Sequence, residues 1–242
     1  MVRHKLPYGL IVSCQAYEGE PLFGAEIMAA MARAAVAGGA VGIRANGPAD
    51  IAAIRRVTAL PIVGLSKVWT SASPVYITPT RAAADAIVAA GCDWVALDAT
   101  SRPRPDGELL ADLIDHIQRD LDRPVLADVA SLEDAQAAQA LGVDAVSTTL
   151  AGCVPGGRPA DVGPDLALLA DLVAHCTLPV VAEGRFQTPE QVARAFALGA
   201  QAVVVGAAIT RPETITRRFV EALPGSKNDE AVERPGPSRG AA

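Results

Sequence analysis

Six polar or charged residues each stand directly after a short apolar run in this sequence. They are Gln15, Arg44, Lys67, Asp98, Asp128 and Glu183. Inverting a carbon next to a carbonyl group needs a base to remove a proton, an acid to return one, and a group that stabilises the enolate oxygen. A lysine and a glutamate suit the first two roles, and an arginine or a glutamine suits the third. These residue types therefore indicate proton transfer, provided that folding brings them together.

Lys67 and Glu183 are the catalytic candidates in this set. A lysine at the end of a buried strand must either reach solvent or take part in chemistry, and it is a poor base unless burial or a nearby cation disfavours its charged form. Glu183 would favour that charged form, so we expect Arg44 to pair with Glu183. Aspartates at strand ends often cap the following helix, and we favour Asp128 over Asp98 for substrate contact.

The elements that must position these residues repeat eight times along the chain. Each unit is a short β-branched apolar run followed by an Ala- and Leu-rich helical pattern. Expected strands cover residues 9–13, 40–43, 61–65, 94–97, 124–127, 145–148, 179–182 and 202–205, and expected helices include 24–37, 81–90, 107–120, 131–141, 164–175 and 189–198. Units of roughly 27 residues and continuous apolar strands predict an α/β fold, a single-domain (β/α)8 TIM barrel. The strand ends of such a barrel meet at one mouth.

The last two strand ends predict a phosphate site. Barrels often bind phosphate with the loops after strands seven and eight, through backbone N–H groups that glycine leaves unobstructed. The matching loops hold Gly184 with Arg185 and Gly206, and Arg211 could add positive charge.

Composition favours one enzyme domain over residues 1–223, followed by a tail over 224–242 that we expect to be disordered. Half of the 242 residues are hydrophobic, and the net charge of -6 argues against nucleic acid or an anionic membrane as a partner. The sequence lacks the pattern of a secretory signal or a membrane span, so a cytoplasmic location is expected.

Neither the cysteines nor the histidines show the spacing of a metal site. They are Cys14, Cys92, Cys153, Cys176, His4, His116 and His175. We therefore expect a mechanism without a metal.

Several segments together resemble the N-acetylmannosamine-6-phosphate 2-epimerase family. They are LIVSCQA (10–16), GEPL (19–22), GGAVGIRANG (38–47), YITPT (76–80), ALDAT with RPRPDG (96–107) and VVVGAAITRP (203–212). The resemblance covers roughly residues 10–223. It implies a (β/α)8 barrel that interconverts N-acetyl-D-mannosamine 6-phosphate and N-acetyl-D-glucosamine 6-phosphate at C2, in sialic acid and amino-sugar breakdown, with no metal or organic cofactor. The implied partner is a phosphorylated N-acetylhexosamine, and a homodimer stays open.

Carried over by position, the resemblance makes Lys67 and Glu183 the catalytic residues. Substrate contacts fall on Gln15, Arg44 and Asp128, and phosphate contacts on Gly184, Arg185, Gly206 and Arg211. The chain departs from the family at Ser66, Val68 and Trp69, where members usually have charged residues near the lysine, so the loop after Lys67 is not fixed by the resemblance. The Gly- and Pro-rich segment 152–165 could fold over the mouth as a lid.

Two alternatives remain open at this point. Lys67 could form a Schiff base with a keto-sugar phosphate, as in a class I aldolase. The barrel could also bind a sugar phosphate without catalysis. Within the epimerase reading, the residues leave open whether Lys67 serves both faces of C2 or shares the task with Glu183.

Overall fold

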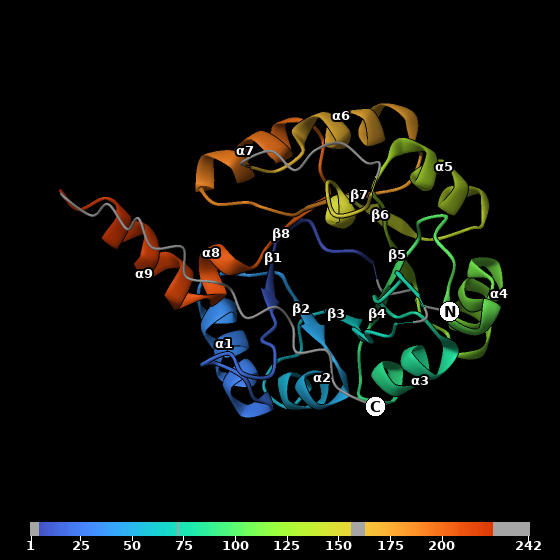
Figure 1. Ribbon diagram of the computed structural model, residues 1–242, viewed down its shortest axis with the longest axis horizontal. Coiled ribbons are helices and arrows are strands. Elements are labelled where there is room, and N and C mark those ends of the chain that lie inside the picture. Colours follow the sequence, from blue (N-terminus) through green and yellow to red (C-terminus); the bar gives the residue numbers. More distant parts are fainter. Residues whose placement is uncertain (1–4, 72, 156–162, 225–242) are drawn as a thin grey trace.

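The computed structural model describes residues 5–71, 73–155 and 163–224, and its eight parallel strands close into a barrel in chain order (Figure 1). The strands are β1 (Gly9–Cys14), β2 (Gly42–Asn46), β3 (Ile62–Leu65), β4 (Trp94–Asp98), β5 (Val125–Asp128), β6 (Ala145–Ser147), β7 (Val180–Glu183) and β8 (Ala202–Val205). β8 pairs with β1, which leaves the sheet without a free edge. The expected single (β/α)8 barrel is confirmed.

Helices surround the barrel as a ring, from which the C-terminal helix extends away (Figure 1). They are α1 (Ala25–Ala37), α2 (Pro48–Arg55), α3 (Arg81–Ala89), α4 (Leu110–Asp115), α5 (Leu132–Ala140), α6 (Leu166–His175), α7 (Pro189–Ala197), α8 (Ala207–Thr210) and α9 (Pro212–Glu221). Four of them begin at a side-chain cap, with Thr80, Ser131, Asp165 and Thr188 each accepting a hydrogen bond from a backbone N–H in the first turn. These caps fix the points at which the loops of the mouth end.

Strand side chains divide between two apolar clusters. One cluster packs under the helices and includes Ile43 and Ala45 of β2. The other fills the barrel interior and includes Val63 and Leu65 of β3. Because successive side chains of a strand point to opposite faces, Arg44 must point into the interior.

The same alternation applies to every candidate residue at a strand end. Interior positions of β1, β3, β4, β5 and β7 are occupied by Ile11, Leu65, Ala96, Leu126 and Val181. Gln15, Lys67, Asp98, Asp128 and Glu183 each follow one of these positions by an even number of residues. All six candidate side chains therefore start from the inward-facing side of their strands.

The expected strands are all present, with shifted ends. β2 begins at Gly42 rather than at residue 40 and continues to Asn46, so Arg44 lies inside the strand and not after it. Asp98, Asp128 and Glu183 are likewise the last residues of β4, β5 and β7. The physical reason is that hydrogen-bonded pairing with neighbouring strands continues through these polar residues, as in the register of Asp98 with Asp128.

The expected helices are present too, with shifted ends. In place of the helix expected at 107–120, α4 begins at Leu110 and continues into a π-helical turn at His116–Asp120. A 3-10 turn at Pro105–Gly107 precedes it, and there Asp106 has a left-handed φ of 55°. The helical pattern in the sequence did not reveal this turn.

The C-terminal helix α9 extends away from the barrel (Figure 1) and buries none of its residues. Of the tail expected at 224–242, only Pro224 lies within the described residues, so disorder of the tail stays a prediction. The part of the chain that the structure describes has no helix long and apolar enough to cross a membrane.

Candidate active site

Three charged side chains meet inside the mouth of the barrel. Arg44 donates from Nη1 to Asp128 Oδ1 at 3.1 Å and from Nη2 to Asp128 Oδ2 at 2.6 Å. Its Nη1 also lies 2.8 Å from Oε2 of Glu183. The side chains of Arg44 and Asp128 are 1% and 0% exposed, and that of Glu183 is 14% exposed. The expected pairing of Arg44 with Glu183 is present, and Asp128 is a second partner.

Asp128 and Glu183 both contact the guanidinium of Arg44, and these contacts influence the pKa values of Arg44 and Glu183. Burial by itself disfavours the charged form of Arg44, but Asp128 and Glu183 more than offset it and raise the pKa of Arg44. Burial raises the pKa of Glu183 to about 7, and the charge of Asp128 acts in the same direction against the opposing effect of Arg44. Glu183 is therefore able to take up and release a proton near neutral pH.

Hydroxyl groups from β6 and the turn after it form hydrogen bonds with the carboxylate of Asp128 and with the backbone of Glu183. Thr149 Oγ1 donates to Asp128 Oδ1 at 2.6 Å and lies 2.8 Å from Ser147 Oγ. Thr148 Oγ1 donates to the Glu183 carbonyl at 2.8 Å and accepts from the Glu183 N–H at 2.9 Å. These threonines were missed in the sequence, although they directly follow β6.

Lys67 lies just beyond β3, where its backbone is held on two sides. Its N–H donates to Asn46 Oδ1 at 2.9 Å, and Lys67 forms an antiparallel bridge with Ile77. The loop after Lys67, which the resemblance left open, turns back as a narrow hairpin in which Val68 N–H donates to the Tyr76 carbonyl at 2.8 Å. Lys67 Nζ donates to the hydroxyl of Tyr17 at 2.5 Å. Tyr17 was not among the predicted residues.

Gln15 completes the inner site from β1. Its Nε2 donates to Ser13 Oγ at 2.8 Å, while its Oε1 is buried without a hydrogen-bond partner among the described residues. Glu183 Oε2 and Arg44 Nε are also buried without a hydrogen-bond partner among the described residues. The contact of Glu183 Oε2 with Arg44 Nη1 is an ion pair that lacks hydrogen-bond geometry. Buried polar atoms normally have partners, so these atoms mark a place suited to a polar ligand.

Asp98 is engaged elsewhere, although it also ends a strand. Its Oδ1 accepts hydrogen bonds from the N–H and the hydroxyl of Thr100, at 3.0 and 2.7 Å, and its Oδ2 pairs with Arg102. Asp98 thereby anchors the loop after β4. Of the two aspartates, Asp128 is the one that lies against Arg44.

The residues predicted to bind phosphate lie at the ends of β7 and β8, but they differ in their contacts. Gly184 has a φ of 111°, which glycine adopts most readily, and Gly206 directly precedes α8. Arg185 donates to the carbonyls of Gly163 and Ala151, both at 2.7 Å, and so supports the loop after β6. Arg211 pairs with Glu20 at 2.9 Å. Phosphate binding by these residues stays a prediction.

Two further expectations concern metals and a lid. The described residues contain no group of three or more His, Cys, Asp or Glu side chains placed to hold a metal ion. Half of the segment 152–165, considered as a lid, lies outside the described residues, namely 156–162.

Known proteins match this chain closely. The model of a family described as "Putative N-acetylmannosamine-6-phosphate epimerase" matches residues 28–224. The chain belongs to this epimerase family. A relative named as a putative N-acetylmannosamine-6-phosphate 2-epimerase, from Clostridioides difficile, is 48% identical over 214 residues, which is 88% of this chain and 95% of that protein.

The fold of this chain is also similar to those of solved structures. The N-acetylmannosamine-6-phosphate 2-epimerase of Clostridium perfringens has a TM-score of 0.86 at 47% identity, over 88% of this chain and 93% of that one. A thiamine phosphate pyrophosphorylase from Pyrococcus furiosus has a TM-score of 0.55 at 17% identity, over 87% and 90%, and supports the barrel fold alone.

Proposed function

We propose that this protein interconverts N-acetyl-D-mannosamine 6-phosphate and N-acetyl-D-glucosamine 6-phosphate by removing and returning the proton at C2, in amino-sugar and sialic acid catabolism. The observation that carries the proposal is the meeting of Lys67, Glu183 and Arg44 at one barrel mouth, in a chain of the epimerase family. Each of the three has a distinct chemical part in such a reaction.

The reaction begins with the open-chain aldehyde of the sugar, because only a carbon next to a free carbonyl has an acidified C–H bond. A base removes this proton from one face of C2, and the electron pair moves into an enolate whose oxygen carries negative charge. Arg44 and the amide of Gln15 are the groups in this mouth that can stabilise that oxygen. Return of a proton to the opposite face gives the second sugar.

Lys67 and Glu183 are the proton-transferring groups in this proposal. Glu183 is suited to exchange a proton because its pKa stands at about 7. Asp128 accepts hydrogen bonds from both terminal nitrogens of Arg44 and so fixes the guanidinium within the mouth. Fixed donors stabilise developing charge without the cost of reorganising during the reaction.

The phosphate group would lie toward the ends of β7 and β8, near Gly184, Gly206 and Arg211. This proposal follows from their place in the barrel and from the accessible backbone N–H groups of glycine-containing loops. The described residues offer no metal cluster, and no step in the proposal calls for one. A homodimer and a cytoplasmic location remain predictions from the sequence.

Incubation of the purified protein with N-acetylmannosamine 6-phosphate in deuterated water tests the proposal by NMR. We expect deuterium at C2 and the appearance of N-acetylglucosamine 6-phosphate. Absence of both label and second sugar would sink the epimerase proposal. Borohydride trapping of a covalent adduct on Lys67, without C2 exchange, would support the aldolase alternative, and binding without either reaction would support a sugar-phosphate-binding barrel.

A further inference from the structure

Tyr17 is the direct partner of the amine that the proposed reaction uses. It lies in the loop between β1 and α1, two residues beyond Gln15. Its hydroxyl accepts a hydrogen bond from Lys67 Nζ at 2.5 Å, whereas the same nitrogen is 4.9 Å from the centre of the ring. Because the nitrogen is so much closer to the hydroxyl than to the ring centre, the hydrogen bond is the principal contact.

The backbone of Tyr17 is fixed by Glu20. The Tyr17 N–H donates to Glu20 Oε2 at 2.9 Å, and the Glu20 N–H donates to the Tyr17 carbonyl at 2.9 Å. Glu20 in turn pairs with Arg211, whose guanidinium carbon lies 5.5 Å from the centre of the Tyr17 ring. Tyr17 thus contacts both the lysine and a candidate phosphate-binding arginine.

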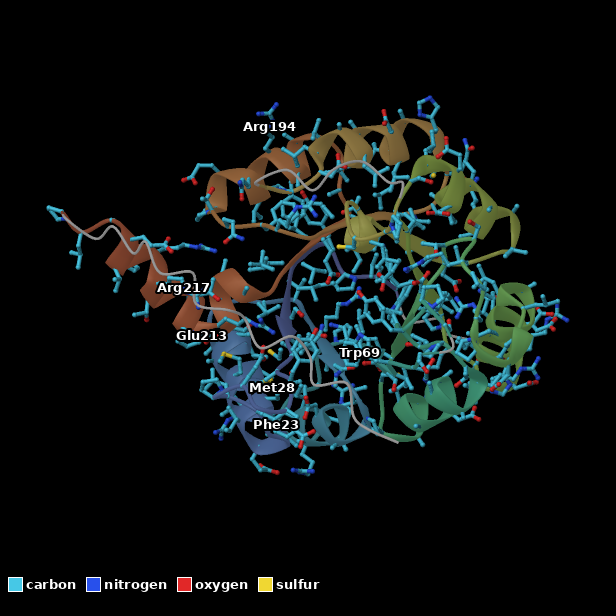
Figure 2. The ribbon with its side chains drawn as sticks, viewed as in Figure 1. Phe23, Met28, Trp69, Arg194, Glu213 and Arg217 are labelled. Atoms are coloured by element: carbon cyan, nitrogen blue, oxygen red, sulfur yellow. The ribbon has the colours of Figure 1, made fainter. Side chains whose placement is uncertain are left out.

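The ring of Tyr17 is held from the hairpin that follows Lys67. Trp69 meets it edge-on, with ring centres 5.6 Å apart and planes at 67°, and Trp69 stacks on Tyr76 at 5.6 Å and 10°. Figure 2 shows Trp69 within the ring of helices, in contrast to Arg217 on the protruding α9. Such aromatic contacts fix ring orientation and stabilise it modestly. The Tyr17 hydroxyl is therefore held in place by its own surroundings.

A fixed hydroxyl matters because a lysine side chain is flexible. Holding its rotatable bonds in one arrangement costs conformational entropy. Proton transfer at C2 requires the nitrogen to lie within hydrogen-bonding reach of the carbon-bound proton, and small displacements slow such reactions strongly. A rigid partner would keep the nitrogen at the mouth before the substrate binds.

We propose that Tyr17 is a positioning residue for Lys67, and that its hydroxyl holds the amine in place for proton transfer at C2. This inference rests on the proposed function. Glu183 at the end of β7 interacts electrostatically with Lys67, whereas Arg211 after α8 lies against the ring of Tyr17. Tyr17 differs from Glu183 in that it contacts the nitrogen through a hydrogen bond.

The variant Tyr17→Phe tests the inference in the full chain, because it removes the hydroxyl and keeps the ring that packs on Trp69. We expect kcat for epimerisation to fall roughly ten- to a hundredfold while KM changes little, since positioning is lost and binding is kept.

Tyr8→Phe is the matched control. Tyr8 is 68% exposed, lies just before β1 and packs its ring on Phe196, so the same chemical change should leave kcat and KM as in the unaltered protein. A second test combines Tyr17→Phe with Lys67→Ala. If the hydroxyl acts through the lysine, it should have no further effect once the lysine is absent.

The inference is overturned if Tyr17→Phe keeps the kcat of the unaltered protein, or if it raises KM and leaves kcat unchanged. It is also overturned if Tyr17→Phe lowers kcat to the same extent in the Lys67→Ala background as alone. These outcomes are distinct from failure of the proposed function, in which the unaltered protein itself shows no exchange at C2.

Discussion

Arg44 and Asp128, which are 84 residues apart in the chain, form a two-point ion pair inside the barrel. The side chains are almost completely buried, and Glu183 adds a second negative charge at 2.8 Å. A buried pair of this kind yields little net stability compared with apolar packing, but removing one partner leaves an uncompensated charge. The pair therefore couples the geometry of the site to the stability of the fold.

Arg44→Ala should destabilise the protein by about 3–5 kcal/mol, because two buried carboxylates lose their counterion. Urea unfolding followed by circular dichroism measures the change. Arg56→Ala is the matched control, since Arg56 pairs with Glu26 at the surface, where the side chains are 60% and 82% exposed. Exposed pairs contribute little, and equal losses in the two variants would contradict our account of the buried pair.

Lys67→Ala should reduce turnover by several orders of magnitude and leave the fold intact. Residues at the catalytic end of a barrel strand contribute little to the core, and Lys67 lies outside the two apolar clusters. Exchange at C2 followed by NMR and the midpoint of thermal unfolding are to be measured together. Turnover close to that of the unaltered protein would reject Lys67 as a proton-transferring residue.

Glu183 should produce an inflection near pH 7 in the profile of kcat/KM, because burial raises its pKa to about 7. Glu183→Gln keeps the size of the side chain and removes its titration, so this inflection should vanish. Loss of nearly all activity at every pH would indicate direct proton transfer by Glu183. If the glutamine variant keeps the inflection, another group is responsible for it.

Unphosphorylated N-acetylmannosamine should be a very poor substrate if the loops after β7 and β8 bind phosphate. Binding energy from a remote group helps to position the reacting carbon, so its loss lowers turnover as well as affinity. Arg211→Ala should weaken use of the phosphorylated sugar more than use of the unphosphorylated one, because only the former would lose a phosphate contact. Arg217→Ala, on the exposed face of α9 (Figure 2), serves as the control. Comparable efficiency on both sugars would argue against the phosphate site.

His116, on the outer surface, should make the free energy of unfolding depend on pH. Its Nε2 lies 2.7 Å from Asp85 and its Nδ1 2.8 Å from Asp120, and these hydrogen bonds raise the pKa of His116 against the opposing effect of burial. The pKa of His116 is therefore higher in the folded protein than in the unfolded chain, where it is about 6.5. Protonated His116 stabilises the fold fully below the unfolded-state pKa, and this stabilisation is lost as the pH rises through the folded-state pKa.

His116→Gln should therefore lower the free energy of unfolding more at about pH 5.5 than at about pH 9. Denaturant unfolding at the two pH values measures this difference. His175→Gln, at an exposed position, is the control. An effect of His116→Gln that is the same at both pH values would show that its hydrogen bonds do not depend on protonation.

The sequence by itself determined the barrel and indicated several polar residues at its mouth, but it did not reveal Tyr17 or Thr149. Continuous β-branched runs at regular spacing can bury both faces only as parallel strands between helices, and this fixed eight strands near their observed positions. Lys67 and Glu183 could be selected because side chains alternate along a strand, so a polar residue an even number of positions after an interior residue also starts from the inward face. The face of the strand from which each candidate side chain starts therefore follows from local geometry alone.

Tertiary structure decided what each of these side chains contacts. Asp128 and Asp98 are both aspartates that end neighbouring strands, yet one pairs with Arg44 and the other anchors a loop through Thr100 and Arg102. The sequence did not reveal that Arg185 donates to two loop carbonyls.

Contacts made by the loops were likewise beyond the sequence. The hydrogen bond from Lys67 to Tyr17 joins residues 50 positions apart, and the one from Thr149 to Asp128 joins residues 21 positions apart. Such contacts depend on the register in which the barrel closes and on the path of each loop over its mouth. Those quantities are set by packing of the whole chain, because no local pattern of residue types specifies the distance between two strand ends.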